Sequence, residues 1–261
     1  MIISIAIQKG GTGKTTTAFN LSAALAKQNN KVLLVSLDSQ KNLNEYVGFK
    51  SDGLPDIFDL ICALVNNKAV PVEQSIRYLE SENIDYIPSS EMLVTAVSML
   101  GASNAARIKN DMVLDRLFML PEFDKYDYII LDCSPSLDLL VINALNASDG
   151  VIIPAIAEVF GVQGITPTLD LVEAIRDTTN TGLQITGILP TMIDSRTSSG
   201  KGLLSFVSEK YKDVVFETWM PRLPAEAANS VMTHNSLVNT KGSRLGARYE
   251  DLASEVIKRN K

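Results

Sequence analysis

The sequence predicts an α/β fold: a doubly wound, mostly parallel sheet flanked by helices. Apolar runs of strand length alternate along the chain with longer segments that are typical of helices. The first run, 2–7, leads into a glycine-rich turn and then into an amphipathic segment, 18–27. At 261 residues with 46% hydrophobic content, the chain is expected to form one domain, 1–261.

The glycine-rich turn at 8–16 lies between a strand and a helix, which is the context of a phosphate-binding loop. Its glycines allow successive N–H groups to point into one concavity, and the helix N-terminus adds partial positive charge. Lys14 is placed to contact the β- and γ-phosphates, and the Thr15 hydroxyl to hold Mg²⁺. Gln8 stands where the usual pattern has glycine, and Lys9 adds a second lysine. Lys9 has two interpretations, a functional charge or a solvated loop charge.

The rest of the chain continues the alternation of predicted strands and helices. Further strands are expected at 31–37, 84–88, 126–132, 150–154 and 183–190. Helices are expected at 52–67, beginning near Pro55, at 91–120 with a break at 101–104, at 137–147 and at 161–178. A polar loop at 194–201 precedes a helix that ends near Tyr211, and the last helix is expected at 250–261. This alternation favours right-handed crossovers between parallel strands.

Two aspartates mark the carboxyl ends of predicted strands. Asp38 follows the strand at 31–37, and Asp132 ends the strand at 126–132. Ligands of open parallel sheets bind at this edge, so both carboxylates are expected near the phosphates. Asp132 matches the Mg²⁺-holding aspartate that ends a hydrophobic strand in nucleoside triphosphatases. The alternative role of Asp38 is a turn residue at a strand end.

Composition limits the classes of partner. A net charge of −6 and a pI of about 4.9 argue against a surface covered with nucleic-acid-binding charge, although a local basic patch is compatible with them. Cys62 and Cys133 match no metal or disulfide spacing, which predicts a reducing compartment. Neither a signal peptide nor a membrane span is recognisable, so a cytoplasmic protein that does not bind membranes is expected.

The loop sequence Lys9-Gly10-Gly11-Thr12-Gly13-Lys14-Thr15 resembles the deviant Walker A motif of the ParA/MinD ATPases, and most closely the ParA/Soj partition type. The resemblance implies a P-loop ATPase fold with two ATPs sandwiched in a homodimer, Lys9 reaching the partner's nucleotide. The implied catalytic residues are Lys9, Lys14 and Asp38. The implied ATP contacts are Gly10, Gly11, Thr12, Gly13, Lys14, Thr15 and Thr16, and the implied Mg²⁺ ligands are Thr15, Asp38 and Asp132. The chain departs from the family pattern at Ser36, Ser39 and Ser134.

The resemblance is looser after residue 218. Pro221 and Arg222 match a family segment that lies against the adenine, and Arg196 stands where the family has a DNA-binding arginine. Ala225 replaces a second such arginine. The substitutes expected to contact DNA, flanking the last helix, are Lys241, Arg244 and Arg248. A solvated charge is the alternative for Arg196.

The implied function is an Mg²⁺-ATP-dependent switch that binds DNA without sequence preference and partitions a plasmid or chromosome. A ParB-like or other cargo-adaptor protein is expected to stimulate slow hydrolysis, and the ATP state is expected on the nucleoid. The same ATPase with a protein cargo is an alternative. A MinD-like membrane ATPase is disfavoured because 250–261 carries acids and few bulky apolar residues. A metal-cluster carrier would need paired cysteines, and a related tyrosine kinase a tyrosine-rich tail.

Overall fold

The strands form one sheet in the computed structural model, which describes residues 1–102, 110–156 and 164–260. They are β1 (Ile2–Ile5), β2 (Val32–Leu37), β3 (Arg77–Leu79), β4 (Ile84–Ile87), β5 (Tyr128–Cys133), β6 (Gly150–Ile156) and β7 (Gln184–Thr191). Their order is β3-β4-β2-β5-β1-β6-β7, and every pairing is parallel except β3 with β4. The predicted doubly wound, mostly parallel sheet is confirmed.

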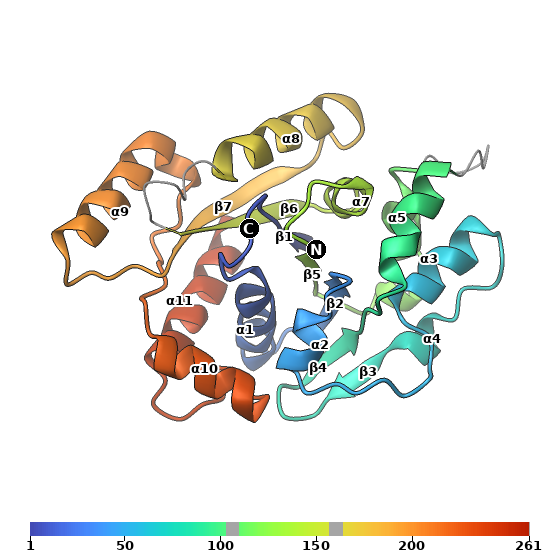
Figure 1. Cartoon of the computed structure of the whole chain (residues 1–261), viewed down its shortest axis with the longest axis horizontal. Coiled ribbons are helices and arrows are strands. Elements are labelled where there is room, and N and C mark those ends of the chain that lie inside the picture. Colours follow the sequence, from blue (N-terminus) through green and yellow to red (C-terminus); the bar gives the residue numbers. More distant parts are fainter. Residues whose placement is uncertain (103–109, 157–163, 261) are drawn as a thin grey trace.

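Helices connect the strands and cover both faces of the sheet (Figure 1). They are α1 (Lys14–Lys27), α2 (Asn42–Tyr46), α3 (Ile57–Val65), α4 (Val72–Ser75), α5 (Leu93–Ala102), α6 (Val113–Phe118), α7 (Leu139–Asn146), α8 (Ile165–Thr178), α9 (Ser198–Tyr211), α10 (Pro224–Thr233) and α11 (Arg244–Arg259). Short 3-10 turns are η1 (Pro121–Phe123) and η3 (Lys212–Val214). None of the helices that the structure describes has the length and apolar character needed to span a membrane.

The central strands contribute side chains to two hydrophobic cores, because successive residues of a strand point to opposite faces. In β2, Leu33 and Val35 join the core beneath α3, α5, α6, α7 and α8, whereas Leu34 joins the core beneath α1, α2 and α11. Burial on both faces explains why the central strands are continuous apolar runs without polar alternation.

The carboxyl ends of the parallel strands lie along one edge of the sheet. Cα pairing places Asp132 of β5 beside Ile5 of β1 and beside Ser36 of β2. The glycine-rich loop leaves β1 at this edge, Asp38 follows the end of β2, and Ser89 follows the end of β4. Three loops distant in sequence therefore converge above the middle of the sheet.

Several expectations about single elements were wrong. The edge strand β3 and helices α2, α4 and α10 were not predicted, since all are short or contain turn-forming residues whose conformation depends on neighbours. Helix α1 begins at Lys14 instead of 18, because the loop glycine Gly13 caps it. Of the helix break expected at 101–104, Gly101 and Ala102 still belong to α5, and residues 103 and 104 lie outside the described residues. Residues 161–163 of the helix expected at 161–178 also lie outside them.

Helices α9 and α11 begin earlier than expected because side chains cap them. The Thr197 hydroxyl accepts a hydrogen bond from the Gly200 N–H, so α9 starts inside the stretch that was expected to be loop. Similarly, the Ser243 hydroxyl accepts from the Gly246 N–H and starts α11 at Arg244. The expectation that Arg244 and Arg248 flank the last helix is therefore wrong, because both lie within it.

Candidate active site

The glycine-rich loop adopts the curled backbone that a phosphate cradle requires. Gly11 and Gly13 have φ angles of +72° and +89°, a left-handed conformation that side chains disfavour. Gly13 is the N-cap of α1, and its carbonyl accepts the Thr17 N–H at 2.8 Å. The loop is braced from β7, where the Thr191 hydroxyl donates to the Thr12 carbonyl at 3.0 Å. The start of α1 is thereby presented to the concavity of the loop.

Lys14 is buried at the first position of α1, and its ammonium group donates to the Lys9 carbonyl at 2.8 Å. Burial lowers the pKa of Lys14, while the charge of Asp132 opposes that change. The bond to Lys9 spans the loop, so the charge is held over the cradle. A phosphate oxygen is a stronger acceptor for this ammonium than a neutral carbonyl.

Asp132 is the most unusual group of the site. Its side chain is fully buried, and neither carboxylate oxygen has a hydrogen-bond partner among the described residues. Burial raises the pKa of Asp132 to about 7, the nearby Asp38 carboxylate adds to the rise, and the Thr15 side chain and Lys14 charge oppose it. A buried carboxylate without partners costs stability unless a ligand satisfies it.

Asp38 lies in a tight turn between β2 and α2. One carboxylate oxygen accepts the Gln40 N–H at 3.0 Å, and the other accepts the Asn42 side-chain amide at 3.2 Å. The Asp38 charge affects the pKa of both Lys14 and Asp132, which places it within their electrostatic reach. The structure thus brings the three residues together from β1–α1, β2 and β5, as the sequence predicts.

These residues fit a magnesium nucleotide. Mg²⁺ prefers oxygen ligands, keeps several waters, and is held by one or two carboxylates together with substrate phosphates. Asp132 offers orphaned carboxylate oxygens, and Thr15 stands beside Lys14 at the start of α1. No group of three or more His, Cys, Asp or Glu side chains in the described part of the chain could hold a metal by itself. The donor set therefore suits a cation that arrives with phosphates.

A cavity of about 340 Å³ adjoins the loop and suits a planar, mostly apolar group. Pro221 and Arg222 line it, as expected for an adenine pocket, together with Thr12, Gly13 and Thr16. Its other walls come from residues that the sequence did not indicate: Thr191, Met192, Met220, Leu223, Pro224, Ala227, Leu245 and Tyr249. Most of them follow β7 or belong to α10 and α11, and no local motif marks them.

Lys9 is partly exposed at the rim of the loop and forms no ion pair with the described residues.

Cys133 is buried next to Asp132, and burial raises the pKa of its thiol to about 12. Burial also raises the pKa of Cys62 on α3. Both thiols are therefore protonated at neutral pH, which is opposite to an activated cysteine.

The four candidate DNA contacts do not form one cluster of free charges. Arg196 lies in the loop before α9 and forms a bidentate pair with Asp194, both N–O distances being 2.9 Å. Arg248 of α11 stacks on the Trp219 ring at 4.9 Å and pairs with Asp251. Lys241 and Arg244 are exposed and form no ion pair within the described residues.

The chain is similar to known proteins over nearly its whole length. A family profile described as an AAA domain matches residues 1–185. The sporulation initiation inhibitor protein Soj of Bacillus subtilis is 36% identical over 256 residues, which cover 98% of this chain and 97% of Soj. The chromosome-partitioning ATPase Soj of Treponema pallidum is 34% identical over 256 residues, covering 97% of this chain and 95% of that protein.

A solved structure shares the fold. The crystal structure of cobyrinic acid a,c-diamide synthase from Mycobacterium smegmatis, with bound ADP and magnesium, superposes with a TM-score of 0.80 at 28% identity. The match covers 98% of this chain and 94% of the synthase. Because a synthase has this fold, the architecture alone does not decide which reaction follows nucleotide binding.

Proposed function

Because the chain belongs to the ParA/MinD family of P-loop ATPases, we propose that it is an ATP-dependent switch that drives the partition of a plasmid or chromosome. In this proposal ATP closes a homodimer, and the dimer binds DNA without sequence preference. Hydrolysis, stimulated by a ParB-like adaptor on the cargo, releases the DNA. The ATP state would then lie on the nucleoid in the cytoplasm.

ATP and Mg²⁺ are the cofactors of the site. The observation that carries this conclusion is the orphaned carboxylate of Asp132, buried within electrostatic reach of Lys14 at the end of a central strand. Thr15 and Asp132 would hold Mg²⁺, the latter directly or through water, and Asp38, within electrostatic reach of Asp132, would contribute to the same site. Bound Mg²⁺ would neutralise phosphate charge during transfer.

The chain's own residues would do the rest. The loop N–H groups of residues 10–16 would bind the phosphates, and Lys14 would move from the Lys9 carbonyl to a phosphate oxygen. Asp38, held by Gln40 and Asn42, would orient the attacking water and accept its proton. Pro221 and Arg222 would cover the adenine in the cavity beside the loop.

Lys9 supports dimerisation in this proposal. Its side chain is partly exposed beside the cradle and lacks an ion-pair partner in the described residues. Lys14 already occupies the position over its own loop, so a second lysine at the rim is available to the nucleotide of a second subunit. Its charge there would stabilise the transition state in trans.

DNA binding would use phosphate contacts, because the expected partner is any duplex. Lys241 and Arg244, exposed and without ion pairs in the part of the chain described, are the candidates with free charge. Arg196 and Arg248 would first have to exchange their carboxylate partners for phosphates. A membrane role for α11 is disfavoured, because Leu245, Tyr249, Leu252 and Val256 are buried in the core that it shares with α1.

The test is binding of a non-specific DNA duplex without nucleotide, with ADP, and with ATP plus Mg²⁺, across a range of salt concentrations. An Asp38→Ala variant, which should bind ATP without hydrolysing it, is measured beside the wild type. Binding that requires ATP and falls as salt rises would support the proposal. ATP-dependent dimers that bind no DNA would contradict the partition function and favour a protein cargo.

A further inference from the structure

Ser89 connects the loop of Asp38 to a different strand. It lies two residues beyond the end of β4 and is buried. Its hydroxyl donates to the Asp38 carbonyl at 2.8 Å and lies 2.8 Å from the Ser36 hydroxyl. Because a hydroxyl has one proton, and a carbonyl can only accept, the Ser36 hydroxyl must be the donor to Ser89. The direction of both bonds is therefore determined.

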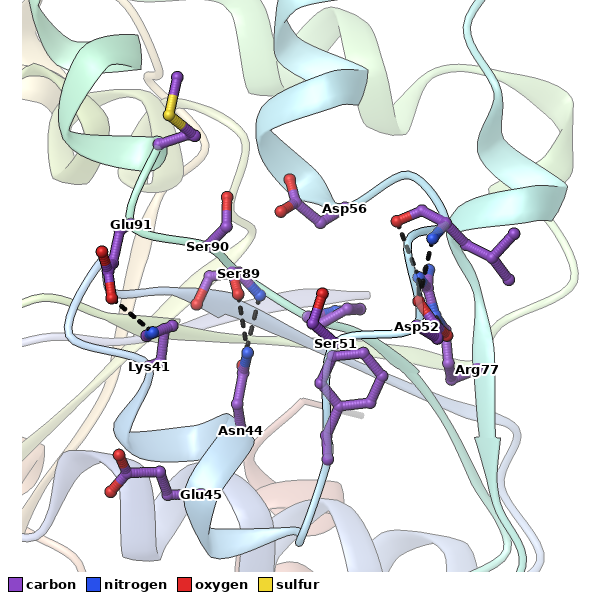
Figure 2. Close-up of a pocket in the computed structure, with 14 residues that line it drawn as sticks. Lys41, Asn44, Glu45, Ser51, Asp52, Asp56, Arg77, Ser89, Ser90 and Glu91 are labelled. Atoms are coloured by element: carbon purple, nitrogen blue, oxygen red, sulfur yellow. Dashed lines mark hydrogen bonds and ion pairs between the residues drawn. The ribbon is translucent and has the colours of Figure 1, made fainter.

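Asn44 of α2 holds the backbone of Ser89 from the other side (Figure 2). Its side-chain amide donates to the Ser89 carbonyl at 2.7 Å, and its oxygen accepts the Ser89 N–H at 3.3 Å. The same oxygen accepts the hydroxyl of the buried Tyr86. A buried network in which each member is satisfied allows few alternative arrangements, so the place of Ser89 is closely constrained.

The Asp38 turn depends on this anchor. The Asp38 carbonyl also accepts the Lys41 N–H at 3.1 Å, and Lys41 has a φ of +59°, an unfavourable left-handed conformation for a lysine. The other bonds to Asp38 come from Gln40 and Asn42, which belong to the same short segment. Among the bonds to Asp38, only the one from Ser89 comes from outside this segment, and the exposed Lys41–Glu91 ion pair, at 2.6 Å, is a second tie between the turn and the residues after β4.

We propose that Ser89 is a positioning residue for ATP hydrolysis, which holds the Asp38 turn so that the carboxylate points at the attacking water. Ser36 and Asn44 act through Ser89. The proposal rests on the proposed function, because it assigns Asp38 the role given there. Displacing a catalytic group by about 1 Å can cost on the order of 100-fold in rate, so losing a hydrogen bond to the Asp38 backbone can lower the rate of hydrolysis.

The main test compares Ser89→Ala with Ser90→Ala. Ser90 is the next residue and lines the same pocket of about 410 Å³, but its hydroxyl makes no hydrogen bond with the described residues. For Ser89→Ala we expect kcat to fall about 10-fold, while the affinity for ATP and Mg²⁺ by calorimetry stays within about twofold. Ser90→Ala should match the wild type in both.

A double-mutant cycle separates positioning from general loss of packing. Ser36→Ala removes the donor to Ser89 and leaves the bond to Asp38, so its kcat should fall by about threefold or less. The Ser36 hydroxyl reaches the Asp38 carbonyl through Ser89, although it also contacts the Tyr86 hydroxyl, so the double variant should lie close to Ser89→Ala. Ser89→Thr retains a hydroxyl and should recover most of the rate. Additive effects of Ser36→Ala and Ser89→Ala, or a wild-type kcat in Ser89→Ala, would overturn the proposal.

Amide hydrogen exchange gives a readout that needs no hydrolysis. In the unliganded protein, the Lys41 amide should exchange faster in Ser89→Ala than in Ser90→Ala, because its acceptor loses an anchor. Thermal unfolding of both variants shows whether the effect is local. If the wild type hydrolyses no ATP, the proposed function fails, and the exchange result still decides whether Ser89 holds the Asp38 turn. Equal exchange in both variants would refute this role.

Discussion

Lys14 and Asp132 are buried, and Asp132 has no hydrogen-bond partner among the described residues. Arg196 and Arg248, in contrast, reach the surface and are already paired with Asp194 and Asp251. Burial of Lys14 and Asp132 costs stability until a ligand binds, whereas Arg196 and Arg248 already have carboxylate partners without a ligand. The comparison shows that a buried charged group without a hydrogen-bond partner indicates a binding site better than surface charge does.

The largest effect is expected for Lys14→Ala. Loss of this buried ammonium removes charge-assisted hydrogen bonds to phosphate, each worth roughly 1.5–3 kcal/mol. ATP affinity measured by calorimetry should therefore fall by more than about 100-fold. Lys50→Ala, at an exposed lysine outside the site, is the matched control. Unchanged ATP affinity in Lys14→Ala would contradict the assignment of the nucleotide site.

Asp132→Asn tests whether the buried carboxylate costs stability. In the unliganded protein the folded-state pKa of about 7 lies above the ordinary value of 3.8. The folded state therefore binds a proton that the unfolded chain releases, and wild-type stability should fall as pH rises from about 4 to about 7, by at most about 4 kcal/mol. The side-chain amide of Asp132→Asn does not titrate, so the free energy of unfolding of this variant, relative to that of the wild type, should increase over that pH range.

Urea unfolding at several pH values measures this difference. Asp170→Asn, at an exposed aspartate of α8, is the control and should run parallel to the wild type. Parallel curves for Asp132→Asn and wild type would mean that burial of the carboxylate does not lower the free energy of unfolding.

The Asp132→Asn variant should also lose the Mg²⁺-dependent part of its ATP affinity, about 10-fold or more, because a neutral amide is a weaker magnesium ligand.

A smaller effect is expected at Lys241 and Arg244, which form no ion pair with the residues that the structure describes. Lys241→Ala and Arg244→Ala should each weaken DNA binding severalfold and reduce the slope of log affinity against log salt by about 1, as one phosphate contact is lost. Fluorescence anisotropy with a non-specific duplex, in ATP and Mg²⁺, measures both quantities. Lys68→Ala, at an exposed lysine after α3, is the control. A wild-type salt slope in both variants would place the DNA surface elsewhere.

The smallest effect, and the sharpest test of the comparison, concerns Arg196. Asp194 holds this arginine in a bidentate pair, and the arginine keeps the pKa of Asp194 at about 2, so the pair persists at neutral pH. Arg196→Ala should change DNA affinity by less than about threefold, whereas Asp194→Asn should tighten binding by releasing the arginine. Weaker binding in Asp194→Asn would indicate that the pair itself forms the DNA-binding geometry.

The sequence predicted the central elements well because they are determined locally. Strands β1, β2 and β5 are continuous apolar runs, and the loop between β1 and α1 has glycines at the positions whose φ is positive. Predictions were poorer at the edges. Strand β3 depends on pairing with β4, and α2 follows a left-handed N-cap residue, Lys41, a conformation that no residue pattern indicates.

The sequence by itself determined the parallel sheet, the phosphate-binding loop and the positions of Lys14, Asp38 and Asp132, since strand length, glycine and strand-end aspartate are local properties. Only the tertiary structure decided which side chains from distant parts of the chain meet. The Trp219 ring against Arg248, the apolar wall formed by Tyr249 and the bond from Ser89 to Asp38 join residues from separate elements. Hydrogen bonding and burial depend on distance in space, which sequence separation does not reveal.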